Sequence, residues 1–344
     1  MTTNIIACIN QKGGVGKTTT VANIGFSLAN MGRKVLLVDF DAQSSLTYYL
    51  NVGVGKEGYD ENAYIYGMLD LLVKDLDDPD YMTDEIEMST WEELIDKCVC
   101  TPTYWAREEK KDVRKPFGFD LIPASILLTD FELYLIKNHM DGNETLRLTR
   151  VLNKVLEYRD YDYIIIDCNP TISILSLNAV AAATAGCVIP TNLDLLSTKG
   201  VVNLLDNIAD IQTALMFMRD EDGNIIGEKW MVHYGVLGVV LNLYKNSRVI
   251  DTKIENDLKM YYPIKIFESQ IPESAYAKRA LFGGQIYSQI YKKAKDAYDK
   301  LAKEIENQII EKEEIFQKYG KQALVQRVGE VNLDMDLEEE HGDE

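Results

Sequence analysis

Apolar residues are arranged along this chain in two different patterns. Short runs such as residues 163–166 are apolar at every position, which is typical of strands in a sheet that is covered on both faces. Longer segments repeat apolar residues every three or four positions, which is typical of amphipathic helices. The predicted strands are residues 4–9, 34–39, 119–122, 162–167, 186–190, 235–241 and 264–267. The predicted helices are residues 17–31, 43–50, 128–139, 144–158, 173–184, 198–217, 249–260 and 288–318. This alternation predicts an α/β fold with a doubly wound, mostly parallel sheet.

Polar residues that could bind a ligand or take part in catalysis cluster where the predicted strands end. Asp39, Asp41 and Asp167 all fall at such ends, and so does the glycine-rich loop at residues 10–18. In open parallel sheets, ligands bind beyond the carboxyl ends of the strands. We therefore expect these side chains and the loop to form one site.

The acidic charge of the chain is confined to two segments. The net charge is −19, yet residues 55–96 hold fourteen acidic residues and two lysines, and residues 332–344 hold seven acidic residues and neither Lys nor Arg. We expect one domain over residues 1–320, interrupted by an insertion at 53–117 with a short helix near 90–97, and a flexible acidic tail at 321–344. The remaining body is neutral overall, so it could still carry a basic face despite the acidic total.

Several classes of protein are disfavoured by composition. No apolar run approaches the ~18 residues of a membrane span, and the apolar run at residues 5–9 is too short for a signal peptide. Five scattered cysteines, with Cys98 and Cys100 too close for a zinc half-site, and three isolated histidines favour a reducing cytoplasm. We expect no membrane association, and no metal site built from cysteine or histidine.

Residues 10–20, Asn-Gln-Lys-Gly-Gly-Val-Gly-Lys-Thr-Thr-Thr, form the most specific motif. A loop of the G-x-x-x-x-G-K-[ST] type points backbone N–H groups and a helix N-terminus at one phosphate. Lys17 can reach the outer phosphates and the Thr18 hydroxyl can ligate Mg²⁺. A glycine-rich turn that binds nothing is disfavoured, because an apolar run precedes the loop and a helical run follows it. The predicted cradle is one run: Gly13, Gly14, Val15, Gly16, Lys17, Thr18 and Thr19.

Four segments in order resemble the ParA/MinD superfamily of deviant Walker A ATPases, whose fold is of the P-loop NTPase type. Residues 12–19 look like its phosphate loop, 35–43 like its second strand motif, 119–125 like the strand between the motifs, and 163–170 like its Walker B strand. The likeness covers roughly residues 1–52 and 118–320 and is greatest to the ParA/Soj branch, which moves plasmids and chromosome origins. Ala42 and Asn169 stand where that pattern usually has proline.

The resemblance implies ATP and Mg²⁺ as cofactors and assigns roles to particular residues. Thr18, Asp39 and Asp167 would hold the Mg²⁺, and Asp41 would position the attacking water. Lys12, outside the cradle, would reach the nucleotide of the partner in an ATP sandwich dimer. The plainer alternatives are that either aspartate is a helix N-cap and that Lys12 is a solvated surface lysine.

Base recognition and nucleic-acid binding have weaker signals. Asn242 matches the position where similar proteins often read the base, and Pro272 lies in a segment that matches a base-flanking one, although Asn242 could equally be a turn residue. Clustered cations are needed for non-specific DNA binding. The candidates lie in two stretches of few acids: Lys245, Arg248, Lys278, Arg279, Lys292 and Lys293.

The function predicted first is a DNA-partition ATPase, slow on its own and stimulated by a ParB-like centromere-binding protein. It would be cytoplasmic and associated with the nucleoid. Two relatives remain open: a ParA-like ATPase that positions protein cargo, and a MinD-like ATPase at the membrane surface. The acidic tail disfavours the second. An iron–sulfur carrier would need bridging cysteines, and the sequence does not place any near the expected dimer face.

Overall fold

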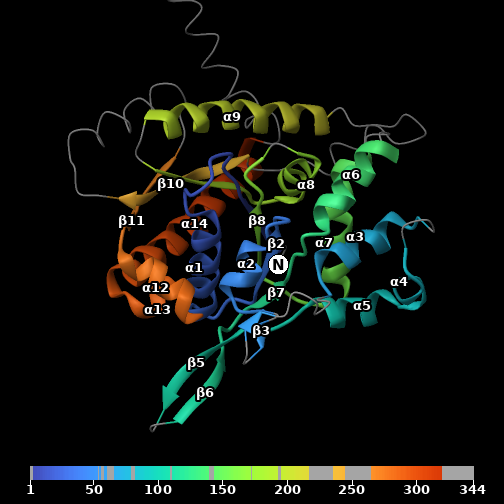
Figure 1. Cartoon of the computed structure of the whole chain (residues 1–344). Coiled ribbons are helices and arrows are strands. Elements are labelled where there is room, and N and C mark those ends of the chain that lie inside the picture. Colours follow the sequence, from blue (N-terminus) through green and yellow to red (C-terminus); the bar gives the residue numbers. More distant parts are fainter. Residues whose placement is uncertain are drawn as a thin grey trace, which may run out of the picture.

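A seven-stranded sheet runs through the centre of the protein (Figure 1). The computed structural model describes residues 3–52, 54–55, 58–59, 66–78, 82–108, 111–138, 143–171, 173–192, 195–216, 235–244 and 265–319. In spatial order the strands are β11 (Ile266–Pro272), β10 (Val236–Tyr244), β9 (Gly186–Asn192), β1 (Asn4–Cys8), β8 (Tyr163–Cys168), β2 (Val35–Phe40) and β7 (Asp120–Ile122). Neighbouring strands all pair in parallel. The predicted α/β fold is confirmed.

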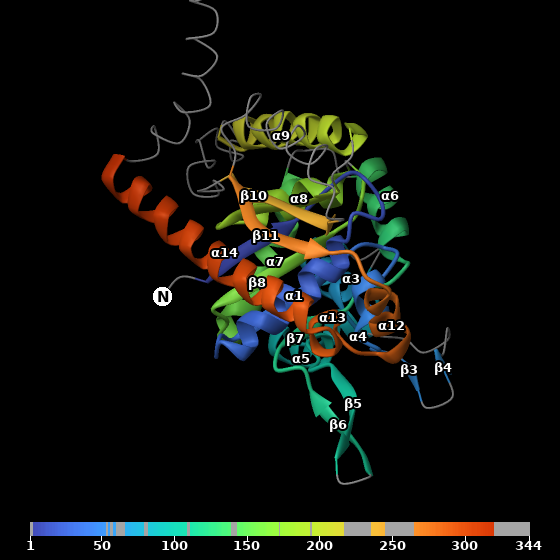
Figure 2. The ribbon, with the colours of Figure 1, turned by 90° about the vertical axis from the view of Figure 1, so that its left-hand side faces the viewer.

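Helices cover both faces of the sheet, and each face has its own apolar core (Figure 2). The strands β2 and β8 are buried along their whole length, as their unbroken apolar runs predict. One core is closed by α3 (Met68–Leu76), α5 (Trp91–Cys98), α6 (Leu128–Asn138), α7 (Arg147–Tyr158), α8 (Ile174–Ala182) and α9 (Leu195–Met216). The other is closed by α1 (Lys17–Asn30), α2 (Ser45–Tyr49), α12 (Ala275–Gly283), α13 (Tyr287–Ile290) and α14 (Lys292–Tyr319). Among the described residues, no helix is both long and apolar enough to cross a bilayer.

Several elements differ from those predicted. The predicted helix at 288–318 is divided into α13 and α14, because Tyr291 has an extended backbone (φ −136°, ψ 107°). The helix α12 was not predicted, and the predicted helix at 249–260 lies outside the described residues. The predicted helix at 144–158 begins as a 3-10 turn, η1 (Asn143–Leu146), before α7.

The segment predicted as an insertion contains more structure than its sequence suggests. Besides α3 and α5 it forms α4 (Asp84–Met88), the short pair β3 (Val54–Gly55) and β4 (Gly58–Tyr59), and a hairpin of β5 (Thr103–Glu108) and β6 (Lys111–Pro116). The hairpin projects away from the body (Figure 1). In contrast, the apolar side of α3 packs into the same core as β2 and β7. The proposed domain limits remain a prediction.

An ion-pair network ties α3 to α7. Asp75 accepts hydrogen bonds from Arg147 Nη1 (3.1 Å) and Arg150 Nη2 (2.8 Å). Arg147 is also paired with Glu144, and the side chains of Asp75, Arg147 and Glu144 are at least nine-tenths buried. Buried charges of this kind are held only while their partners remain.

Asp75→Ala is expected to destabilise the protein by about 2–3 kcal/mol, because it leaves a buried guanidinium with one partner fewer. Urea unfolding measures the change. The matched control is Lys154→Ala, which removes the exposed Lys154–Glu157 pair and should cost no more than about 0.5 kcal/mol. Equal losses in the two variants would contradict a role for the buried network.

Candidate functional site

The candidate site lies at the carboxyl edge of the sheet, where β1, β2 and β8 end side by side. In the strand register, Asp167 on β8 is level with Cys8 on β1 and with Asp39 on β2. The chain continues from β1 into the loop that leads to α1. The structure therefore brings together the loop and the two strand-end carboxylates that the sequence predicts for the site.

The loop at residues 9–16 leaves free space beside two of its glycines. Gly14 and Gly16 have left-handed backbones (φ 77° and 87°), which favour glycine. A Cβ added at Gly13 or Gly14 would meet no atom within 4 Å. That side of the loop therefore has room for a ligand to approach the backbone.

Asn10 holds the front of the loop, and sequence reasoning did not single it out. It is 1% exposed; its Nδ2 donates to Pro190 O (2.7 Å) and its Oδ1 accepts from Lys12 N (2.9 Å). An asparagine directly after an apolar strand is the signal that could have identified it, because a buried amide must find partners.

Lys17 is the first residue of α1 and lies inside the curve of the loop. Its side chain is buried, and its Nζ donates to Lys12 O across 3.5 Å, a long and weak hydrogen bond. A stronger acceptor placed in the loop can replace that contact. The neighbouring Thr18 and the predicted trans-acting Lys12 are both half-buried.

The two buried carboxylates differ in how they are satisfied. Asp39 accepts from Thr47 N (2.8 Å), Thr47 Oγ1 (2.7 Å) and Asp41 N (3.3 Å). Asp167 is 1% exposed, no well-formed hydrogen bond from the described residues reaches its carboxylate oxygens, and only the nearby Thr18 and Lys17 offset its charge. An orphaned buried carboxylate is costly unless a cation compensates it.

The pKa values of both carboxylates are raised, but different contacts lower them again. Burial raises the pKa of Asp39 to about 7, against the lowering effect of its bonds to Thr47 and Asp41. Burial, and then the charge of Asp39, raise the pKa of Asp167 well above its ordinary value, while Thr18 and Lys17 lower it. Strongly perturbed carboxyl groups of this kind concentrate at functional sites.

Asp41 forms a turn just beyond β2. Its Oδ1 accepts from Gln43 N (2.9 Å) and its backbone carbonyl accepts from Ser44 N (2.7 Å). The alternative of a helix N-cap does not describe it, because α2 begins after Ser44. The Asp41 side chain is half-buried, so water can reach it, and its predicted role with the attacking water remains a prediction.

The two predicted base-flanking residues have protein partners. The Nδ2 of Asn242 donates to Val15 O (2.8 Å) and Thr20 Oγ1 (3.0 Å), so both amide hydrogens are used beneath the loop. Pro272 O accepts from Tyr287 Oη (2.9 Å). The Oδ1 of Asn242 has no hydrogen-bond partner among the described residues, so the predicted base contact remains a prediction.

The predicted cations are only partly described. Lys278 and Arg279 on α12 are exposed, as are Lys292 and Lys293 at the start of α14, and Arg279 lies over the Tyr276 ring at 5.6 Å. Lys245 and Arg248 lie outside the described residues. Helix α14 packs on α1, whereas α12 packs on α13, which in turn contacts α1 (Figures 1 and 2).

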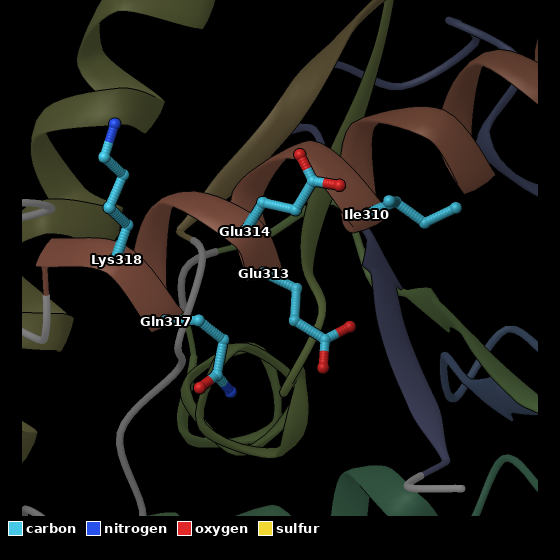
Figure 3. Close-up of a pocket in the computed structure, with 5 residues that line it drawn as sticks. All are labelled: Ile310, Glu313, Glu314, Gln317 and Lys318. Carbon is cyan, nitrogen blue, oxygen red and sulfur yellow. The ribbon is translucent and has the colours of Figure 1, made fainter.

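A surface hollow near the end of α14 is separate from this site. Its lining is drawn in Figure 3: Ile310, Glu313, Glu314, Gln317 and Lys318. Lys312, in the same turns, donates to Val236 O at the start of β10, which places this part of α14 at the amino edge of the sheet. Two carboxylates in the lining also make it unsuitable for phosphate.

A glycine-rich loop from a buried strand to a lysine-led helix, with carboxylates at neighbouring strand ends, is the arrangement of P-loop nucleoside triphosphatases. The family model for an AAA domain matches residues 3–218. Soj of Bacillus subtilis is 31% identical over 303 residues, covering 88% of this chain and 97% of Soj. The chromosome partitioning protein ParA of Caulobacter vibrioides is 26% identical, covering 88% and 93%. The chain belongs to the ParA/MinD family of ATPases.

A solved structure agrees with the fold. Cobyrinic acid a,c-diamide synthase from Mycobacterium smegmatis, with bound ADP and magnesium, has a TM-score of 0.58 and 26% identity. The match covers 88% of this chain and 93% of that one.

Asp167→Asn is expected to stabilise the ligand-free protein by about 1–2 kcal/mol, or roughly 1–3 °C in Tm, because it removes a buried carboxylate whose charge Lys17 and Thr18 offset only in part. Scanning calorimetry without nucleotide measures it. Asp160→Asn is the control, since the Asp160 side chain is 92% exposed and should leave Tm unchanged. A fall in Tm of the Asp167 variant would show that the carboxylate is already compensated.

Proposed function

We propose that this chain is a DNA-partition ATPase that binds Mg²⁺ and ATP, forms an ATP sandwich dimer and then binds DNA without sequence preference. Its hydrolysis of ATP is slow alone and is stimulated by a ParB-like centromere-binding partner. The observation that carries the nucleotide part is the buried, orphaned carboxylate of Asp167 beside Lys17 and the open loop.

The residues present fit a magnesium nucleotide. Gly13 and Gly14 leave the backbone of the loop open to phosphate oxygens, and Lys17 brings an ammonium inside the curve. Thr18 and Asp167 are the proposed Mg²⁺ ligands, with Asp39 in the surrounding shell. The ion would neutralise phosphate charge during phosphoryl transfer. The ADP and magnesium bound by the Mycobacterium smegmatis protein support this assignment.

Hydrolysis also needs a positioned water and a second source of positive charge. We assign the water to Asp41, whose turn holds the carboxylate just beyond the β2 end, within reach of solvent. We assign the charge to Lys12 of a second copy, because Lys12 stands outside the cradle that Lys17 occupies. Neither role is part of ATP binding itself, so loss of either residue should leave ATP binding intact.

The DNA part of the proposal rests on the relatives and on charge. Soj and ParA resemble this chain over 88% of its length, and the second is named for chromosome partitioning. The exposed cations Lys278, Arg279, Lys292 and Lys293 are few in one chain. A dimer doubles them, which links DNA binding to the ATP state.

Asp41→Ala and Lys12→Ala are expected to fail at different steps. Loss of the water-positioning carboxylate should block turnover and accumulate an ATP-bound dimer, whereas loss of Lys12 should leave ATP binding intact and prevent dimerisation. Light scattering with ATP, together with phosphate release, distinguishes the two. If Lys12→Ala dimerises as readily as wild type, Lys12 is a surface residue; if Asp41→Ala turns over normally, another group holds the water.

Binding of duplex DNA should require ATP and weaken steeply with salt, by a logarithmic slope of about −0.9 for each neutralised phosphate. Changing Lys278 and Arg279 together to Ala should reduce that slope by about 2–4 in the dimer. Lys34→Ala is the control, since this exposed lysine pairs with Asp160 and is not in the predicted patch. An ATP dimer that ignores DNA at low salt but binds anionic vesicles would replace partition with positioning at a membrane surface.

A further inference from the structure

Asn242 is a buried amide that holds the underside of the phosphate loop. It is 2% exposed, comes from the end of β10, and uses both Nδ2 hydrogens on Val15 O and Thr20 Oγ1. The contact is so close that a Cβ on Gly16 would lie 2.8 Å from Asn242 Nδ2. The loop and this side chain therefore fit each other only with glycine at position 16.

The backbone beside Asn242 is strained. Leu243, the next residue, has a left-handed backbone (φ 53°), which is unfavourable for a branched side chain. The register between β10 and β11 also shifts between Leu241 and Tyr244. Strain of this kind persists where surrounding contacts impose it, and here it accompanies the inward turn of the amide.

Helix α1 gives this contact a fixed base. Asn23 Oδ1 accepts from Ser288 N (2.8 Å), and Ser27 Oγ donates to Asp299 Oδ1 (2.8 Å), so α1 is bonded to α13 and α14. Asn242 bonds at once to this anchored helix, through Thr20, and to the loop, through Val15. Asn242 therefore connects the anchored helix α1 to the loop that binds phosphate.

We propose that Asn242 is a positioning residue that keeps the phosphate loop in its phosphate-binding shape. The proposal rests on the proposed binding of ATP. When only a fraction of the molecules has the loop in its phosphate-binding shape, the apparent affinity for every ligand is its intrinsic affinity multiplied by that fraction. Loss of the two hydrogen bonds from Asn242 must therefore weaken the binding of every ligand of the phosphate loop by the same factor, whatever base the ligand carries.

The test compares three ligands in the presence of Mg²⁺: ATP, GTP and inorganic tripolyphosphate, which has no base. Asn242→Leu, of similar volume but without donors, should weaken tripolyphosphate and ATP by the same factor, about 10- to 100-fold. The ratio of ATP to GTP affinity should stay at the wild-type value. KM for ATP should rise while kcat at saturation changes little, because bound ligand restores the loop.

Asn178→Leu is the matched control for the loss of a buried amide. Asn178 is also 2% exposed and its Nδ2 donates to Glu144 O (2.7 Å) and Ile174 O (2.8 Å), contacts that do not involve the loop. This variant should lose stability and keep wild-type affinity for tripolyphosphate. Thr20→Val, which removes one partner of Asn242, should weaken tripolyphosphate by an intermediate factor even if Asn242→Leu does not fold.

Two results would overturn the proposal. If Asn242→Leu loses the preference for ATP over GTP and keeps its affinity for tripolyphosphate, the residue reads the base. If both Asn242→Leu and Thr20→Val bind tripolyphosphate as wild type does, the hydrogen bonds are not needed for the loop. Wild-type protein that binds neither ATP nor tripolyphosphate would instead contradict the proposed function itself.

Discussion

Two carboxylates buried side by side at the ends of β2 and β8 constrain the whole site. Asp39 and Asp167 are level in the register and almost fully shielded from water, so the charge of Asp39 opposes the ionisation of Asp167. Asp39 is compensated locally by Thr47 and Asp41, whereas Asp167 has only the nearby Lys17 and Thr18 to offset its charge. Such a site is unfavourable when empty, and a cation bound there stabilises the folded chain by mass action.

Helix α1 connects this site to the other elements of the core in which it is packed. Its first residue, Lys17, lies in the loop, while the buried polar residues further along it bond to β10, α13 and α14. The exposed cations Lys292 and Lys293 begin α14. The proposed ATP site and part of the proposed DNA surface therefore lie on α1 and α14, which pack directly against each other. A change at the nucleotide site could reach that surface through this one contact.

The sequence predicts the central strands of the sheet well because they are continuously apolar, whereas β11, which alternates between buried and exposed residues, begins and ends later than its predicted range. It predicts the location of the site because polar residues follow the central strands. It does not predict α3, where the apolar side is mixed with Asp70, Asp75 and Asp77, or the β5–β6 hairpin, which is largely charged and has little apolar alternation. The contact of the Asn242 amide with the phosphate loop could not be predicted from the sequence either. That contact depends on Leu243 and on contacts with residues more than two hundred positions away, which local pattern cannot contain.

The central claim is that a compensating cation completes the site around Asp167, and calorimetric titration of the wild-type chain with ATP tests it most directly. The titration is made once with Mg²⁺ and once with a chelator. The account predicts one ATP for each chain with Mg²⁺ and an affinity at least about tenfold weaker without it, a difference of about 1.4 kcal/mol. Equal affinity under both conditions, or no binding with Mg²⁺ present, would contradict it.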